Sequence, residues 1–418
     1  MINSHHALYS HVLEITRAKP QEAGRYRFII VGLTAFLAFA FGLNLFAVGP
    51  ITPIMIEHFD VNNSRAGLLT SIVFFVHIVL AIPASLLVGR MGLKSIITLG
   101  AIVASTTLLS FSATNSFTLL LLLRGISGVG FLLVFPAVGP LFMQWVRPRE
   151  LPLANGIFVT AASAGITVSS FLVAPLSEAI GWEIVLSSLG GLSMISTVTW
   201  VLLGRANEFI VDDPIRSQIR NVWKVIWSRN AILIAIADAG PLALLSVALG
   251  WLPAFYYEAH GISLVRGGVL MGLLSLSGLV SLVAATFLTT KIHSRRPFLV
   301  IPGALIGLAG LSVVFLAGSG AIYFAVIVLG LACWIYVPAL VTIPMDLYSN
   351  KPRTVSYIFA ALLGFGGIAS FAAPPIVGAL ADYTGSYIPG LVIFAVLASS
   401  LGIAGLMLPE SGRSKSAI

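Results

Sequence analysis

Long apolar runs, separated by short polar gaps, repeat along the 418 residues of the chain. Each run is close to the about 20 residues with which an α-helix crosses the hydrocarbon core of a membrane. Because nearly all the gaps are short, neighbouring helices must pack antiparallel. The pattern predicts an all-α membrane protein with twelve transmembrane helices, at Phe28–Gly49, Gly67–Val88, Lys94–Phe111, Phe117–Phe142, Leu153–Pro175, Ile184–Leu203, Ala231–Tyr256, Gly267–Leu288, Phe298–Ala317, Ala321–Pro344, Val355–Leu380 and Ile388–Leu408.

Positive charge is distributed unevenly between the gaps. Of the 23 Lys and Arg residues, 20 lie in the two tails and in every second gap. Arg65 and Arg266 lie in the other gaps, and Arg124 falls inside the fourth run. By the positive-inside rule, both termini and the gap after the sixth run are cytoplasmic, and an even number of spans also puts the termini on one side. We expect a multi-pass protein of the plasma membrane, in a prokaryote the inner membrane.

The longest and most charged gap, between Gly204 and Asn230, divides the runs into two groups of six. Residues 215–228 of this gap mix tryptophan and aliphatic side chains with basic ones, which is typical of a short helix lying at a membrane surface. The sequence predicts a cytoplasmic N-terminal tail (1–27), an N-terminal six-helix bundle (28–204), a cytoplasmic linker with an interfacial helix (205–229), a C-terminal six-helix bundle (230–408) and a cytoplasmic C-terminal tail (409–418).

Composition excludes several classes of protein. With 58% hydrophobic and 9% charged residues, the chain is neither a soluble domain nor a disordered one. The net charge of +8 does not indicate nucleic-acid binding, because the excess follows the membrane topology. The single Cys333 allows no disulfide or cysteine metal site within one chain. No phosphate-binding Gly-Lys-Ser/Thr loop and no paired catalytic groups occur, so we expect no direct use of ATP, no metal or cofactor, and no enzyme activity.

Two short motifs stand out in the N-terminal group of runs. One follows the second run, and the other lies inside the fourth run. The loop after the second run has Arg90, Gly92 and Lys94, and Gly89 stands before them. Arg124 is followed by a Gly-x-Gly inside the fourth run. Both motifs resemble those of the major facilitator superfamily, whose loop motif has an acidic residue where this chain has Gly89. The absence of that acid removes the charged contact usually attributed to this loop.

A narrower resemblance concerns the seventh and eleventh runs. Trp251-Leu-Pro253 and the stretch 374–387, which contains Gly378 and Asp382, are similar to sequences of the branch that contains cyanate and 2-nitroimidazole carriers. Trp-Leu-Pro also occurs in other anion-carrying branches. This resemblance favours an anion as the transported molecule.

The superfamily resemblance implies two pseudo-symmetric six-helix bundles that rock about a central site. It implies a secondary active transporter that works by alternating access, as a monomer surrounded by membrane lipid, with protons as the expected coupling ion. A small organic or inorganic anion is the expected substrate, because Arg124 and His77 give a positive cavity that only Asp238 opposes. A proton-driven exporter of apolar or cationic drugs is the alternative within transport. A transport-like membrane sensor is the alternative from another class.

Ionisable groups inside the runs are candidates for function, because placing them in the membrane costs at least about 2.5–3.5 kcal/mol. Arg124 could bind a carboxylate through its planar guanidinium, or backbone carbonyls could hold it in a structural or proton-relay role. Asp238 could carry the coupling proton, or it could be paired or hydrated near the helix N-terminus. His77 could bind substrate or protons, or it could form a hydrogen bond between helices.

Further candidates follow from the position of each run in the family fold. The first, fourth, seventh and tenth helices line the central cavity in that fold, which implies that Asn44, Trp334 and Tyr336 face the substrate. Residues at the cytoplasmic helix ends are expected to form a gate between the halves, and these are Arg90, Lys94, Asp346 and Arg353.

Overall fold

A computed structural model describes residues 24–147, 150–206, 223–292, 294–348 and 352–411. All regular elements of this part are helices. Eleven helical segments are long and apolar enough to cross a membrane, and Leu93–Leu109 is a shorter apolar helix of 17 residues. Together they give the twelve crossings that the sequence predicts. Of the predicted linker helix, residues 223–226 are helical, and 215–222 lie outside the described residues.

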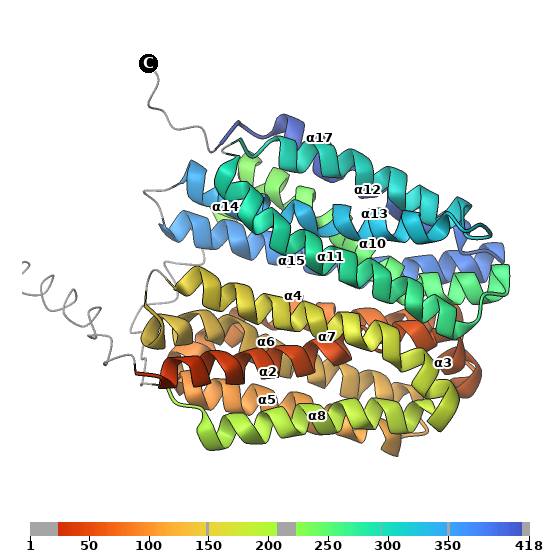
Figure 1. Cartoon of the computed structure of the whole chain (residues 1–418), viewed down its shortest axis with the longest axis horizontal. Coiled ribbons are helices and arrows are strands. Elements are labelled where there is room, and N and C mark those ends of the chain that lie inside the picture. Colours follow the sequence, from red (N-terminus) through yellow and green to blue (C-terminus); the bar gives the residue numbers. More distant parts are fainter. Residues whose placement is uncertain (1–23, 148–149, 207–222, 293, 349–351, 412–418) are drawn as a thin grey trace, which may run out of the picture.

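The helices fall into two halves that lie side by side (Figure 1). The N-terminal half consists of α2 (Tyr26–Leu45), η1 (Gly49–Ile51), α3 (Thr52–Phe59), α4 (Asn63–Met91), α5 (Leu93–Leu109), η2 (Ser110–Ala113), α6 (Phe117–Trp145), α7 (Leu151–Ile180) and α8 (Trp182–Leu203). The C-terminal half consists of α10 (Arg229–His260), α11 (Leu264–Lys291), α12 (Pro297–Phe315), α13 (Ile322–Ile335), α14 (Val337–Leu347), α15 (Pro352–Thr384), α16 (Ile388–Leu397) and α17 (Ser400–Met407).

We call the end of the molecule that holds Tyr26 and Met407 the terminal end, which is on the left in Figure 1, and the opposite end the distal end. At the terminal end, α4 and α5 are joined by Gly92 alone, whose φ of 77° is in the left-handed region. A side chain is strained there, so the family-like glycine allows α5 to start directly after α4. Gly181, with a φ of 89°, makes the equivalent one-residue turn between α7 and α8 at the distal end.

Two predicted spans contain a break in the helix. The first run divides after Leu45 into α2, η1 and α3, and prolines occupy the first turns of η1 and α3. The tenth run divides at Tyr336, and Pro338 lies in the first turn of α14. Proline lacks the backbone N–H that would bond to the preceding turn, so it is favoured where a helix restarts. Both breaks lie close to the boundary between the halves.

Within each half, small residues let helix backbones touch. A Cβ on Gly42 of α2 would lie 2.0 Å from the carbonyl oxygen of Ala162 in α7. In the C-terminal half, a Cβ on Gly330 of α13 would lie 2.1 Å from the carbonyl oxygen of Leu274 in α11. Close backbone contact replaces the hydrophobic driving force that is missing between helices in lipid.

The halves also meet through glycines, at the distal end. Gly67 of α4 packs on the backbone of Pro374 in α15, and one turn further along Gly378 packs on the carbonyl of Asn63. Beside this crossing, the Thr52 hydroxyl donates to the Gly250 carbonyl of α10 over 3.2 Å. Three elements of the N-terminal half, α4, η1 and α3, are thus fixed against the C-terminal half near this end.

Candidate functional site

A small pocket lies between the two halves, near the middle of α7, α10 and α11. It has room for about one water molecule. Both halves contribute to its wall, and none of the lining residues is charged. They are Phe46 of the α2–η1 connection, Ser163 and Ile166 of α7, Leu245 and Leu249 of α10, Ser275 of α11 and Trp334 of α13.

Asp238 is a buried carboxylate of α10 that pairs with a side chain of the tenth span. Its side chain is 6% exposed, and its Oδ1 accepts a hydrogen bond of 2.9 Å from the Tyr336 hydroxyl. A Cβ on Gly366 of α15 would lie 3.5 Å from its other oxygen, so α15 leaves room for the carboxylate. The structure therefore brings together Asp238 and Tyr336, which the sequence predicts as a proton site and a cavity residue.

Tyr336 stands at the junction between α13 and α14, two residues after Trp334 of the pocket wall. The indole ring of Trp334 packs over Gly278 of α11, where a Cβ would lie 2.3 Å from the ring. The contact between Asp238 and Tyr336 thus lies at the junction that follows Trp334 of the pocket wall.

Arg124 is held by backbone carbonyls of two neighbouring helices. Its side chain is 1% exposed. Nε donates to the carbonyl of Leu69 in α4 over 2.9 Å, Nη1 donates to that of Asn44 over 2.7 Å, and Nη2 donates to that of Leu45. The last two carbonyls end α2, where no further helix turn satisfies them. This geometry favours the structural interpretation of Arg124 over direct contact with an anion.

The remaining candidates of the N-terminal half lie apart from the pocket or outside the description. The Asn44 amide donates 2.8 Å to the Ala40 carbonyl and 3.0 Å to the Ser193 hydroxyl, so it faces α8 within its own half. Lys94 is exposed at the start of α5. The side chains of His77 and Arg90 are outside the described residues, as is that of Arg353 in the other half. Their predicted roles stay predictions.

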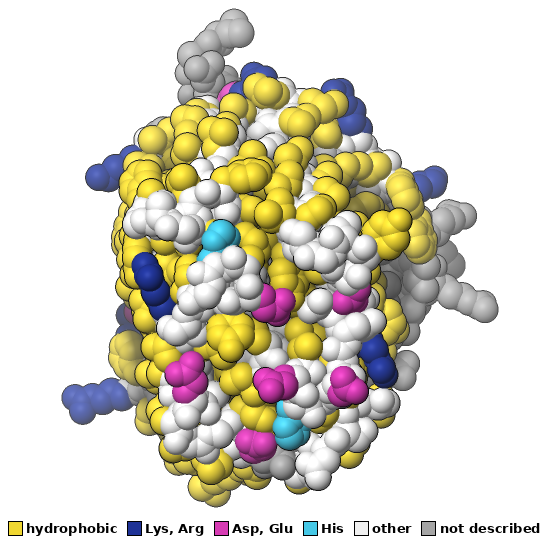
Figure 2. Space-filling view, turned by 90° about the vertical axis from the view of Figure 1, so that its right-hand side faces the viewer, with side chains coloured by type: hydrophobic (Ala, Val, Ile, Leu, Met, Phe, Trp, Pro, Cys, Tyr) yellow, Lys and Arg dark blue, Asp and Glu magenta, His cyan; other side chains and the backbone are white. Residues whose placement is uncertain are grey.

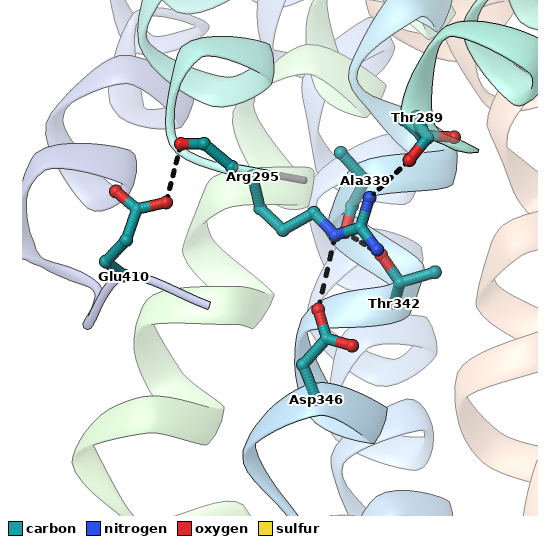
Figure 3. Close-up of polar contacts among 7 residues, drawn as sticks. Thr289, Arg295, Ala339, Thr342, Asp346 and Glu410 are labelled. Atoms are coloured by element: carbon teal, nitrogen blue, oxygen red, sulfur yellow. Dashed lines mark hydrogen bonds and ion pairs between the residues drawn. The ribbon is translucent and has the colours of Figure 1, made fainter. Parts of the chain in front are cut away.

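Asp346 forms an ion pair within the C-terminal half. Arg295, which precedes α12, lies 3.2 Å from the Asp346 carboxylate of α14 and donates to the Thr289 carbonyl of α11 over 2.8 Å (Figure 3). Next to it, the Ser294 hydroxyl donates to Glu410 over 2.7 Å. The described contacts of Asp346 therefore fasten α14 to α11 and α12 at the terminal end, instead of joining the two halves.

A contact between the halves that the sequence did not predict lies at the distal end. Asp382 of α15 accepts hydrogen bonds from the backbone N–H groups of Asn63 and Ser64, at 3.0 and 2.9 Å. These groups begin α4, where backbone N–H groups lack partners and the helix dipole favours an anion. A carboxylate of one half thus caps a helix of the other half, and we call this contact the distal latch.

Tyr387 extends the distal latch to α10. Its hydroxyl lies 2.8 Å from Asn63 Oδ1 and 3.0 Å from Glu258 Oε1, and it donates to one of them at a time. Burial raises the pKa of the Tyr387 hydroxyl, and the carboxylates of Glu258 and Asp382 raise it further. The hydroxyl therefore keeps its proton and remains a donor between the two halves.

Acidic side chains surround the distal latch on the surface. Figure 2 shows the distal end, where Asp and Glu gather across the face and Lys and Arg lie toward its edges. The acidic residues of this end are Glu57, Asp60, Glu178, Glu183, Glu258 and Asp382. Basic side chains prevail among the described residues of the terminal end, where Arg25, Arg27, Lys94, Arg147, Arg205, Lys224, Arg229, Lys291, Arg295 and Arg296 outnumber Glu150, Asp346 and Glu410.

Comparison with known proteins identifies the family of this chain. A family model described as Major Facilitator Superfamily matches residues 34–370. The chain belongs to this superfamily. It is therefore a membrane transporter and no enzyme, in agreement with the prediction from the loop motif and Arg124.

Two relatives of this transporter carry functional names. A "Probable sulfoacetate transporter" of Cupriavidus necator is 24% identical over 419 residues, which cover 93% of this chain and 96% of the relative. A "Probable galactarate/D-glucarate transporter" of Bacillus subtilis is 22% identical over 395 residues, which cover 86% of each chain. Both names refer to small organic anions.

A solved structure supports the fold. A bacterial homologue of the human lysosomal transporter Spinster, crystallised in an inward-facing and unoccupied conformation, matches with a TM-score of 0.68 at 16% sequence identity. The match covers 92% of this chain and 95% of that one. This similarity shows that the two chains have the same fold.

The site contains residues that sequence reasoning missed. Ser163 and Ser275 line the pocket from the fifth and eighth spans, which are not the cavity-lining positions that the family resemblance implied. No sequence signal separates these two serines from the many other serines of the spans, because they differ from the others only in facing the pocket. Asp382 stood out only as part of a motif, and its partner, the start of α4, is 319 residues away.

Proposed function

We propose that this transporter moves a small organic or inorganic anion across the membrane by alternating access, coupled to protons. The carrying observation is the buried pair of Asp238 and Tyr336, located at a helix junction two residues from Trp334, which lines a small pocket between the halves. The anion class is supported by the names of the two relatives.

Alternating access follows from the size of the pocket and the position of the contacts. An organic anion needs more room than one water molecule, so the halves must separate on one side for it to enter. The distal latch and the glycine contacts hold the halves together at the distal end. The described contacts therefore hold the distal end closed in this form of the protein, and we place the opening for the substrate at the terminal end.

Proton coupling follows from charge balance. Moving one negative charge into a cell against the membrane potential costs about 2.3 kcal/mol per 100 mV. A proton that travels with each anion cancels this cost, and a buried carboxylate is suited to take it up. When Asp238 takes up a proton, it no longer attracts the Tyr336 hydroxyl as an anion does, and the junction between α13 and α14 gains freedom.

The orientation is part of the proposal. Most basic residues belong to the tails and loops of the terminal end, so we place that end in the cytoplasm. The acidic distal end then faces the outside.

Transport by purified protein in liposomes tests this function. The assay measures uptake of radiolabelled sulfoacetate, malonate and D-glucarate, with and without an inward proton gradient. We expect saturable uptake of at least one anion, with accumulation above equilibrium only when the gradient is imposed. Saturable flux of a hydrophobic cation without flux of any anion would overturn the proposal and favour the drug exporter, which the apolar pocket wall would also suit.

A further inference from the structure

Serine hydroxyls in the spanning helices are mostly satisfied by the preceding helix turn. In α7, the hydroxyls of Ser169 and Ser170 donate to the Ile166 carbonyl at 3.0 and 2.8 Å. In α11, the Ser277 hydroxyl donates to the Leu274 carbonyl at 2.9 Å. Such bonds leave the hydroxyl without a free hydrogen for a ligand, so these serines have a structural role.

Ser275 departs from this pattern, although it lies only two residues before Ser277. Its side chain is 7% exposed and lines the pocket, and its hydroxyl has no hydrogen-bond partner among the described residues. Leaving a buried polar group unsatisfied costs roughly 1–3 kcal/mol, so this hydroxyl is available on its pocket side to a ligand or to the one water molecule that the pocket can hold.

Two more donors line the same pocket. Ser163 faces it from α7, and Trp334 faces it from α13. The Ser163 carbonyl accepts from Thr167 of the same helix, and no hydrogen bond within the described part of the chain involves the Ser163 hydroxyl or the Trp334 indole N–H. The other lining residues are apolar. Three residues with neutral donor groups thus line the pocket, one from the N-terminal half and two from the C-terminal half.

We infer that Ser163, Ser275 and the Trp334 indole N–H together bind the carboxylate or sulfonate group of the substrate. The inference rests on the proposed function and adds the residues that recognise the anion. Hydrogen bonds to an ionised oxygen are shorter and about twice as strong as neutral ones, and apolar surroundings strengthen them further. An indole N–H can only donate, which favours an oxyanion over a cation.

Neutral recognition also explains how an anion is bound while Arg124 is occupied. Three carbonyls already hold the Arg124 guanidinium, and no lining residue of the pocket is charged. Neutral donors bind an anion less tightly than a fixed cation, which suits a carrier that must release its substrate on the other side. Because the donors come from both halves, the bound anion also pulls the halves together.

The test uses the full-length transporter in liposomes with two anions that contain no hydroxyl group, sulfoacetate and malonate, and one that contains several, D-glucarate. The variants are Ser163→Ala, Ser275→Ala and Trp334→Phe, which remove one donor each and keep most of the side-chain volume. Ser169→Ala and Ser277→Ala are matched controls, because their hydroxyls bond to their own helices. Size-exclusion profile and melting temperature report whether each variant folds.

We expect each pocket variant to raise the KM about tenfold or more for every anion that the wild-type protein transports, including the hydroxyl-free ones. The controls should stay within about twofold. The three substitutions are independent, so a variant that fails to fold leaves two others to decide.

Three results would overturn the inference. Folded pocket variants with the wild-type KM would show that the donors do not bind the anion. Because these variants would still transport the anion, the proposed function would remain. Weaker uptake of D-glucarate alone would show that the donors read hydroxyl groups instead of the charged group. No saturable uptake of any of the three anions by the wild-type protein would remove both the proposed function and this inference.

Discussion

The distal latch makes a quantitative prediction about the conformational equilibrium of the transporter. Asp382 accepts two backbone hydrogen bonds at the N-terminus of α4, from Asn63 and Ser64. The substitution Asp382→Asn removes the negative charge and leaves one acceptor oxygen in nearly the same volume. The distal end should then open more readily, because the capping contact joins the two halves.

The magnitude follows from the two hydrogen bonds and from the exposure of the side chain. In a buried site, each hydrogen bond to a carboxylate contributes about 1.5–3 kcal/mol, and an anion at a helix N-terminus contributes about 0.3–1 kcal/mol. Asp382 is exposed, so water and salt weaken both contributions. Since asparagine keeps one of the two bonds, we expect a loss of about 1–2 kcal/mol, which changes the ratio of closed to open forms about 5- to 30-fold.

Distances between spin labels on the two halves measure this ratio. Labels at Glu57 of α3 and Ser319 of the C-terminal half occupy exposed sites at the distal end, and the native Cys333 is buried. In Asp382→Asn, the long-distance population should grow by the stated factor. Glu178→Gln is the control, because it removes an exposed acid of the same end that forms no hydrogen bond or ion pair with the other half among the described residues. Equal distance distributions in Asp382→Asn, the control and the wild type would refute the role of the latch.

Three further predictions concern the buried charges and the topology. Asp238→Asn should abolish proton-driven accumulation of substrate. It should spare the exchange of labelled for unlabelled substrate, because exchange needs no net proton movement. Accumulation that still follows the pH gradient would exclude Asp238 as the proton site. Arg124→Lys should lower the melting temperature and the yield of folded protein more than substrate affinity, since lysine cannot reach three carbonyls in a fixed plane. A selective loss of affinity would instead indicate contact with the anion. A cysteine at Ser217 should react with impermeant reagents only from the cytoplasmic face, and labelling in intact cells would invert the proposed orientation.

The sequence predicts the fold well because the bilayer constrains it strongly. A chain in lipid must satisfy its backbone within helices, so run length alone locates the spans. Where proline breaks this rule, sequence reasoning loses detail. The sequence predicts one helix over the run from Phe28 to Gly49. In the structure, α2 ends at Leu45, and the chain continues through η1 into α3. The break leaves the carbonyls of Asn44 and Leu45 without helix partners, and Arg124 binds them.

The candidate site is harder to predict, because a residue type does not state which neighbour it faces. The sequence predicts Asp238 as a proton site and Tyr336 as a cavity residue, without relating the two. Their hydrogen bond depends on how α10 packs against the junction between α13 and α14. Asn44 lies in a cavity-lining span, yet its amide turns toward Ser193 of α8. Successive side chains on a helix are rotated by about 100°, so an error of one residue in register is enough to change the neighbour that a side chain faces.

Among the residues that the structure describes, the two ends of the molecule differ in how the halves are joined, and the difference starts from single residues. At the terminal end, Gly89 occupies the position where the superfamily motif has an acid, and the described acid Asp346 is bound by Arg295 of its own half. At the distal end, Asp382 and Tyr387 bind across the boundary, and Gly67 and Gly378 bring the backbones close enough for them to do so. Because contacts between the halves set the relative stability of the two access states, a chain with this distribution should favour the state closed at the distal end. A substrate that enters from that end must therefore first overcome the latch.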